Sequence, residues 1–311
     1  MNLRNYVRLV TRSALDGPLG NLLRDHVFRI EVAREARFVE SQRERSGLAA
    51  SSEIEITKQL RSRGGETFFI LGSGSSTEDD VDHRFSIVSQ GVSVGINAWV
   101  LHDFVPTFYC FEPVPSREID HYRVLSFLNR PDVLEAKPAI LVLRPRSSVE
   151  FEQMRQIPTA LIPRTMVYGR VAVPTRDLRH LQRDSAVSLS HLVGRRPPLV
   201  TMDSGASVIR MTSLAIQLGF RKIVYVGVDL NHTEYFWERN PSYLQRRGIV
   251  SFRSSQKGSR HETLNPESRP FPVTDVIRAI SDGYGREPDF RLFSGSPGSE
   301  LSRFLPIFDW T

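Results

Sequence analysis

The sequence predicts an α/β fold in which a mainly parallel β-sheet is covered by helices on both faces. Three observations support this prediction. Strand-forming runs alternate with helical segments from residue 66 onward, several of these runs are apolar throughout, and polar or glycine-rich residues directly follow three of them. A run that is apolar throughout indicates a strand buried on both faces, as parallel strands are. The 311 residues are enough for one such domain with an extension.

Residues 1–63 differ from the rest and predict an N-terminal helical extension. They are rich in Arg and Glu, and Phe28, Val32, Ala36 and Val39 recur at spacings of four, four and three, which places them on one helix face. Such a face packs on the main domain or on a second subunit, so a homo-oligomer is expected. A basic helix lying on an anionic membrane is the alternative, as peripheral contact with the inner membrane.

The main domain is predicted over residues 64–311, beginning at the paired glycines Gly64 and Gly65. Between residues 231 and 272 the chain is polar and rich in arginine without clear periodicity, which predicts a lid, with a disordered segment as the alternative. The predicted strands are Thr67–Leu71, Phe85–Ser89, Val92–Ile96, Thr107–Phe111, Ala139–Leu143, Lys222–Val228 and Asp289–Phe293, and the predicted helices are Ser204–Leu218 and Val273–Asp282.

Charge and cysteine content limit the class of protein. The chain carries 41 basic and 35 acidic residues, a formal charge of +6, and nearly all of the basic residues are arginine. Arginine favours phosphate and carboxylate ligands, but here the arginines are spread along the chain among acids, so nucleic-acid binding is not expected. A single cysteine, Cys110, and the lack of any 18-residue apolar run predict a cytoplasmic protein without a spanning helix.

Three polar segments stand where strands are predicted to end, which is where open parallel sheets bind ligands. Gly72–Ser76 (GSGSS) predicts a loop whose backbone approaches a phosphate or ribose, with a plain tight turn as the alternative. Asp203–Gly205 opens the predicted helix Ser204–Leu218, so Asp203 or Ser204 could instead be a simple N-cap. Asp229 leaves an apolar strand, and capping the next turn is the alternative to a ligand contact.

Taken in order, these segments resemble the bacterial sialyltransferases of glycosyltransferase family 42. The resemblance rests on GSGSS after the first strand, the strand that ends in GIN at Asn97, Ser204-Gly205 before a helix, and the run LGFRKIVYVGVD that ends at Asp229. Tyr235, a histidine before Thr274-Asp275 and the tail FRLFSGSPGSELSRFL extend it over about residues 66–305.

The resemblance implies a metal-independent, inverting transfer of sialic acid or a related nonulosonate from a CMP-sugar to a glycan acceptor, on a Rossmann-like variant of the GT-A fold. It requires no cofactor, because the CMP-sugar is the substrate. It places a general base at His261, with His232 as the rival, and phosphate-contacting groups at Tyr235 and Asn231. Glu112 occupies the position of an asparagine in the family. The expected nucleotide-binding residues are Gly72, Ser73, Gly74, Ser76, Asn97, Glu112, Asp203, Ser204, Gly205 and Asp229.

Other functions remain open at this stage. Asp80-Val81-Asp82 spells the D-x-D of metal-dependent glycosyltransferases, although a helix start explains it as well. A Mg-ATP-dependent phosphotransferase resembling the pterin diphosphokinases is one alternative function, and a non-catalytic nucleotide-binding scaffold is another. The sequence does not name the acceptor or choose among nonulosonates.

Overall fold

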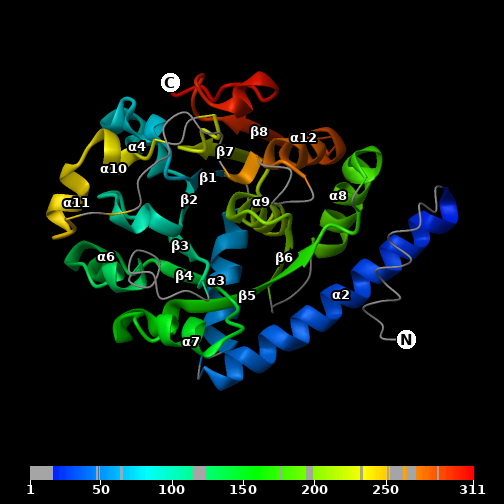
Figure 1. Ribbon diagram of the computed structural model, residues 1–311, viewed down its shortest axis with the longest axis horizontal. Helices are drawn as coiled ribbons and strands as arrows, with labels where there is room; N and C mark the ends of the chain where they lie inside the picture. The colour runs from blue at the N-terminus through cyan, green and yellow to red at the C-terminus, as the bar shows by residue number, and fades with distance from the viewer. Residues whose placement is uncertain are drawn as a thin grey trace.

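The computed structural model describes residues 17–46, 48, 50–63, 66–114, 124–175, 177–193, 199–231, 234–250, 252, 262–264, 271–285 and 287–311. Their strands form one eight-stranded sheet in the order β6-β5-β4-β3-β2-β1-β7-β8, and every neighbouring pair is parallel. The fold is therefore the predicted Rossmann-like α/β fold, with helices around a parallel sheet (Figure 1).

The strands are β1 (Thr67–Leu71), β2 (Val92–Ile96), β3 (Phe108–Phe111), β4 (Ala139–Leu143), β5 (Thr165–Ala172), β6 (Val200–Asp203), β7 (Lys222–Val226) and β8 (Arg291–Ser294). The α-helices are α2 (Pro18–Arg45), α3 (Ala50–Ser62), α4 (Val81–Val88), α6 (Pro131–Ala136), α7 (Ser148–Met154), α8 (Leu178–Leu192), α9 (Ser207–Gln217), α10 (Phe236–Arg239), α11 (Ser242–Arg246) and α12 (Val273–Tyr284). Short 3₁₀ helices are η1 (Ser75–Glu78), η2 (Asn97–Leu101), η3 (Val124–Leu128), η4 (Thr159–Arg164), η5 (Glu262–Leu264) and η6 (Glu300–Arg303).

Two cores lie on opposite faces of the sheet, because successive strand residues point to opposite sides. Phe68 and Ile70 of β1 belong to the core shared with α3, α8, α9 and α12. Phe69 and Leu71 belong to the core shared with α4, α10 and α11. Both faces of β1 are thus buried, which explains why its sequence is apolar throughout.

The predicted strand Phe85–Ser89 is wrong, because these residues lie in and just after helix α4. Val81, Phe85 and Val88 recur at spacings of four and three, and Phe85 and Val88 are buried against the second core. This spacing is that of a helix face, whereas a strand would need alternation. The helix also provides the crossover that parallel strands β1 and β2 require.

Strands β5 and β6 and helix α8 were not anticipated from the sequence. β5 reads TMVYGRVA, and Gly169 and Arg170 interrupt its apolar run. A Cβ at Gly169 would come within 2.6 Å of Glu35 Cγ in α2, so glycine is needed for the close approach of that helix. Arg170 contacts Glu112, which follows β3, as described below.

The N-terminal helix α2 packs on β5, the strand next to the edge strand β6, and also against α8 (Figure 1). Phe28, Val32 and Val39 are buried, and Ala36 is half-buried against the same core. Glu35 of α2 forms an ion pair with Arg144, and Arg24 forms one with Asp184 of α8 at 3.0 Å. This part of the extension therefore shares its core with the main domain; the boundary at residue 63 stays a prediction.

In the part of the chain that the structure describes, no helix combines the length and apolar character needed to cross a bilayer.

Candidate functional site

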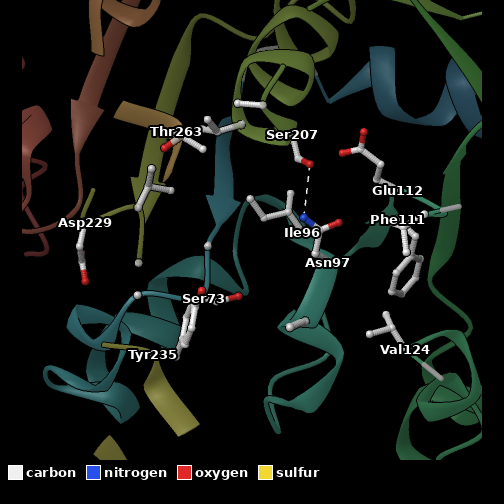
Figure 2. A pocket seen from close by; sticks show the side chains of 18 of the residues that line it. Ser73, Ile96, Asn97, Phe111, Glu112, Val124, Ser207, Asp229, Tyr235 and Thr263 are labelled. Atoms are coloured by element: carbon white, nitrogen blue, oxygen red, sulfur yellow. Dashed lines mark hydrogen bonds between the residues drawn. The ribbon is translucent and has the colours of Figure 1, made fainter. Parts of the chain in front are cut away.

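A cavity of about 340 Å³ opens at the carboxyl ends of β1, β2, β3 and β7 (Figure 2). The chain runs from β1 to one side of the sheet and returns after β6 to place β7 on the other side of β1. The carboxyl ends of the strands at such a switch point are the usual place for a ligand in a parallel sheet. The cavity therefore lies where the fold itself predicts a binding site.

The cavity collects most of the residues singled out in the sequence. Its walls include Gly72, Ser73, Gly74, Asn97, Glu112, Gly205, Asp229 and Tyr235. Ser76, Asp203, Ser204 and Asn231 do not line it, and each lies next to a residue or chain segment that does. His261 and His232 fall outside the described residues, so their predicted role as base stays a prediction.

The glycine-rich loop after β1 is held against the end of β7 by its own amides. Gly72 N–H donates to Val226 O at 2.7 Å, and Gly74 N–H donates to Gly227 O at 2.8 Å. Ser76 donates to the Asp229 carboxylate both from its amide, at 3.0 Å, and from its hydroxyl. Asp229 thus fastens the loop, and these amides are already used within the protein.

Both glycines of the loop are required by packing. A Cβ at Gly72 would come within 2.5 Å of Gly227 O, and a Cβ at Gly74 would collide with the Asp229 carboxylate. The sequence suggested that glycine here admits a ligand; the structure gives these two glycines a contact with β7 instead. Ser73 is the loop residue whose side chain lies at the cavity beside Tyr235 (Figure 2).

The N-terminus of α9 faces the cavity and offers a site for an anion. The helix begins at Ser207 rather than at Ser204, and its N-cap is Ala206, which has no side-chain hydrogen bond to give. Asp203 is therefore not the N-cap, and its carboxylate accepts from Gly205 N–H at 2.8 Å instead. Gly205 through Val208 line the cavity. An uncapped helix N-terminus carries partial positive charge and favours a phosphate.

Two arginines and two carboxylates form a buried network beside α9, called here the cavity network (Glu112, Arg170, Asp203, Ser207 and Arg210). Arg210 is fully buried and donates to Asp203 at 2.7 Å, to the Ser207 hydroxyl at 2.9 Å and to Glu112. Arg170 donates to Glu112 at 3.0 Å and lies 3.3 Å from Asp203. Two positive and two negative groups therefore share one site.

Arg210 keeps its charge in this network. Burial lowers the pKa of its guanidinium, but Tyr168, Asp203 and Glu112 raise it, and the net shift is upward. Burial raises the pKa of the neighbouring Cys110 thiol to about 11, so the thiol stays protonated and unreactive. The network positions Glu112 and Ser207 at the cavity wall.

Aromatic side chains close the opposite end of the cavity. Tyr235 stacks on Trp237 with ring centroids 4.5 Å apart and an interplanar angle of 15°, and Phe252 packs edge-on against Trp237 at 5.3 Å. All three line the cavity. Tyr235 also forms a backbone bridge with Gly74, so α10 is attached to the glycine-rich loop. Flat aromatic faces of this kind suit the apolar face of a sugar ring.

Asn231 does not face the cavity. Its side-chain amide donates to Gly298 O at 2.5 Å, which ties the chain after β7 to the loop after β8. The D-x-D segment also lies elsewhere: Asp80 precedes α4 with a left-handed φ of 49°, and Asp82 lies in the first turn of the helix. This segment is a helix start. Within the described ranges, no group of three or more His, Cys, Asp or Glu residues is placed to hold a metal ion.

Several residues of the site carried no clear sequence signal. Ser207 and Arg210 lie in the helix segment SVIRMTS, where the only sign is an arginine in an otherwise buried helix. Trp237 lies in the predicted lid, and Gln153 of α7 lines the cavity while it holds the backbone of Val114 through hydrogen bonds of 3.1 and 2.7 Å. Only the fold brings these positions together.

A second buried polar network, called here the closed network (Glu78, His102, Asn240 and Tyr243), lies outside the cavity. The Phe104 amide donates to His102 Nδ1 at 3.0 Å, so we assign the proton of the neutral ring to Nε2. Nε2 then donates to the Tyr243 oxygen at 3.1 Å, and the Tyr243 hydroxyl donates to Glu78 at 3.0 Å. Asn240 donates to the same carboxylate at 3.2 Å. This chain fastens α11 to η1 and η2.

Charge in the closed network is set by burial and pairing. Burial lowers the pKa of His102, and Glu78 only partly offsets this effect. Burial raises the pKa of Glu78, but the nearby His102 ring and the hydrogen bonds from Asn240 and Tyr243 bring it below its ordinary value. The network is thus a neutral histidine and a carboxylate joined through a tyrosine.

The fold and the site together define an α/β protein with a cavity at the switch point of a parallel sheet. Comparison with solved structures finds a chain described as the MAf glycosyltransferase from Magnetospirillum magneticum AMB-1, with a TM-score of 0.41 and 17% sequence identity. The match covers 94% of this chain and 43% of that one. At this TM-score the similarity identifies no function. No family model and no curated protein matches the chain.

Proposed function

We propose that this protein is an inverting glycosyltransferase that transfers a nonulosonate, such as sialic acid, from a CMP-sugar to a glycan acceptor. The observation that carries the proposal is the convergence in one cavity of residues from separate sequence segments: Ser73, Asn97, Gly205 and Tyr235. These are residues on which the resemblance to family 42 sialyltransferases rests or to which it assigns a role. The cavity and the family resemblance support the proposal separately, because the cavity is a feature of the geometry and the resemblance rests on the order of motifs in the sequence.

The layout of the cavity suits such a donor. The N-terminus of α9 would hold the phosphate, which lies between nucleoside and sugar in a CMP-sugar. The aromatic end, with Tyr235 and Trp237, would hold the transferred sugar and the acceptor. The Tyr235 hydroxyl would donate to the departing phosphate and stabilise its charge as the bond breaks.

The reaction needs one base and no bound metal. The acceptor oxygen bonds to the anomeric carbon of the donor, the bond from that carbon to the phosphate oxygen breaks, and CMP leaves. The acceptor proton passes to the base, which we propose to be His261 with His232 as the alternative. Thr263 lines the cavity two positions after His261, and Leu230 and Glu234 line it on either side of His232.

The test is CMP release from a panel of CMP-nonulosonates with EDTA present. We expect release by the full chain, and loss of about 10²- to 10⁴-fold in His261→Ala with CMP affinity retained. If His261→Ala releases CMP at the native rate, the matched variant His232→Ala should lose this activity instead, which would identify His232 as the base. An absolute requirement for Mg²⁺ and ATP would instead support the diphosphokinase-like alternative, and CMP binding without turnover on any donor would support the scaffold.

We also propose that α2 meets a second copy of the chain. Leu19 and Leu22 are 64% and 66% exposed near the start of this helix. The double variant Leu19→Asp, Leu22→Asp should convert a dimer to a monomer in sedimentation velocity. An unchanged sedimentation coefficient together with lost binding to anionic vesicles would favour the membrane alternative.

A further inference from the structure

Glu112 is a carboxylate that retains hydrogen-bonding capacity toward the cavity. It directly follows β3, and its side chain is 30% exposed. One oxygen accepts from Arg170 at 3.0 Å and the other accepts from Arg210. A carboxylate offers about four acceptor sites, so each oxygen keeps one lone pair. Since Glu112 lines the cavity, these acceptors are available to a ligand.

The two arginines make this carboxylate rigid as well as available. Arg210 is fully buried and fixed by three partners, and Arg170 is fixed by its contacts with Glu112 and Asp203. A fixed acceptor can discriminate among ligands by orientation, whereas a mobile surface glutamate cannot. The arrangement is therefore that of a recognition group.

The surroundings of Glu112 suit a flat ring. Phe111 and Val124 flank it on the same side of the cavity, away from Asp229 and Tyr235 (Figure 2). Val114 and Leu125 add further apolar surface. A base would lie between these side chains with its polar edge toward Glu112 and Asn97.

Glu112 also lies close to the proposed phosphate site. The same nitrogen of Arg210, Nη2, donates to the Glu112 carboxylate and, at 2.9 Å, to the hydroxyl of Ser207, the first residue of α9. A nucleoside monophosphate with its phosphate at the N-terminus of α9 would therefore have its nucleoside beside Glu112. The sugar end of the donor then lies toward Tyr235.

We propose that Glu112 reads the exocyclic amine of cytosine and rejects uracil, an inference that rests on the proposed use of a CMP-sugar. A carboxylate accepts the N4 amine of cytosine, whereas uracil presents its O4 acceptor at that position and is repelled. Adenine and guanine also carry amines, so the first test includes AMP and GMP.

The first test changes the ligand and leaves the protein intact. Calorimetry on the full chain compares CMP, UMP, AMP, GMP and zebularine 5′-monophosphate, which is CMP without the exocyclic amine. We expect CMP to bind about 10- to 100-fold more tightly than UMP and the zebularine nucleotide, as for a hydrogen bond to a charged group. Equal affinity for CMP and the zebularine nucleotide, or tighter binding of GMP or AMP, overturns the inference.

The second test changes the residue. Glu112→Gln should weaken CMP by about 10- to 100-fold and leave the zebularine nucleotide nearly unchanged, which closes a double-mutant cycle. Glu78→Gln is the matched control, because Glu78 is a paired carboxylate of the closed network and does not line the cavity. It should lower the melting temperature like Glu112→Gln but keep the ratio of CMP to UMP affinity.

The outcomes separate this inference from the proposed function. If Glu78→Gln changes the ratio as much as Glu112→Gln, the preference does not come from Glu112 and the role of Glu112 is wrong. If the full chain releases CMP from a CMP-sugar but binds UMP as well as CMP, only the base recognition fails. If the full chain binds no nucleotide, the proposed function fails with it.

Discussion

The cavity network and the closed network are both buried, charged and well paired, but they differ in access. Glu112 keeps acceptor sites that face the cavity. In the closed network the Glu78 carboxylate accepts from Asn240 and Tyr243, and His102 uses both ring nitrogens within the protein. The comparison teaches that a shifted pKa or a buried charge alone does not indicate a ligand site. Spare hydrogen-bonding capacity at a cavity does.

Loss of the central charge of the cavity network should have the largest effect. Arg210→Leu leaves Asp203 and Glu112 without their main partner, and breaking a buried pair in this way costs about 3–5 kcal/mol. Urea titration of the variant and the native chain measures this change in the free energy of unfolding. Arg303→Leu is the control, since Arg303 is 73% exposed and pairs only with Glu300 in the described part of the chain. A loss below about 1 kcal/mol in Arg210→Leu would contradict the central role of this arginine.

The glycine-rich loop gives the next effect. Gly74→Ala places a methyl group against the Asp229 carboxylate and should cost about 1–3 kcal/mol, as overpacking does. Gly298→Ala is the matched control, because the nearest atom to its Cβ would be Ser296 Oγ at 3.7 Å. Thermal unfolding of both variants measures the loss of stability. Equal stability would mean that Asp229 does not hold the loop.

In the closed network, Tyr243→Phe removes the hydroxyl that joins His102 to Glu78. We expect a loss of about 1–2 kcal/mol, because one hydrogen bond to a carboxylate and one from the imidazole disappear. Nucleotide affinity should not change, since this network lies outside the cavity. A large drop in CMP affinity in a folded Tyr243→Phe protein would show that the two networks are coupled.

Acid should act on the closed network in a defined direction. The pKa of His102 is lowered from its ordinary value of 6.5, chiefly by burial. Below pH 6.5 the unfolded chain therefore binds a proton that the folded chain does not, and stability falls as the pH falls toward the folded pKa. Glu78 adds a loss in the same direction below its ordinary pKa of 4.5. Urea unfolding at pH 7.5 and 5.5 should show a smaller pH dependence in His102→Gln, and an unchanged dependence would exclude His102 as its source.

The sequence predicted the strands that are buried on both faces, because their apolar runs have a single interpretation. β1 (TFFIL) and β4 (AILVL) are such runs, and both have the expected bounds. The sequence did not predict β5, where two residues have other roles. Gly169 allows α2 to pack closely on the strand, and Arg170 belongs to the cavity network. Both interrupt the apolar pattern of β5.

The candidate site divides in the same way. Residues at strand ends, such as Asn97 and Glu112, could be found because parallel strands bring their ends together. Arg210 could not, since it lies within a buried helix and gains its role only when α9 packs on β1, β2 and β6. The α4 segment misled because Phe85–Ser89 is too short for its period to be clear without Val81.

Binding of CMP to the full chain, with Ser207→Asp as the blocked variant, tests the central claim most directly. Ser207 is the first residue of α9 and lines the cavity, and an aspartate there suits a helix N-terminus while it places negative charge where the phosphate would lie. Isothermal titration calorimetry in EDTA should give saturable 1:1 binding of CMP to the native chain and none to a folded Ser207→Asp protein. Absence of CMP binding by the native chain, or equal binding by the blocked variant, would contradict the assignment of this cavity as a CMP-sugar site.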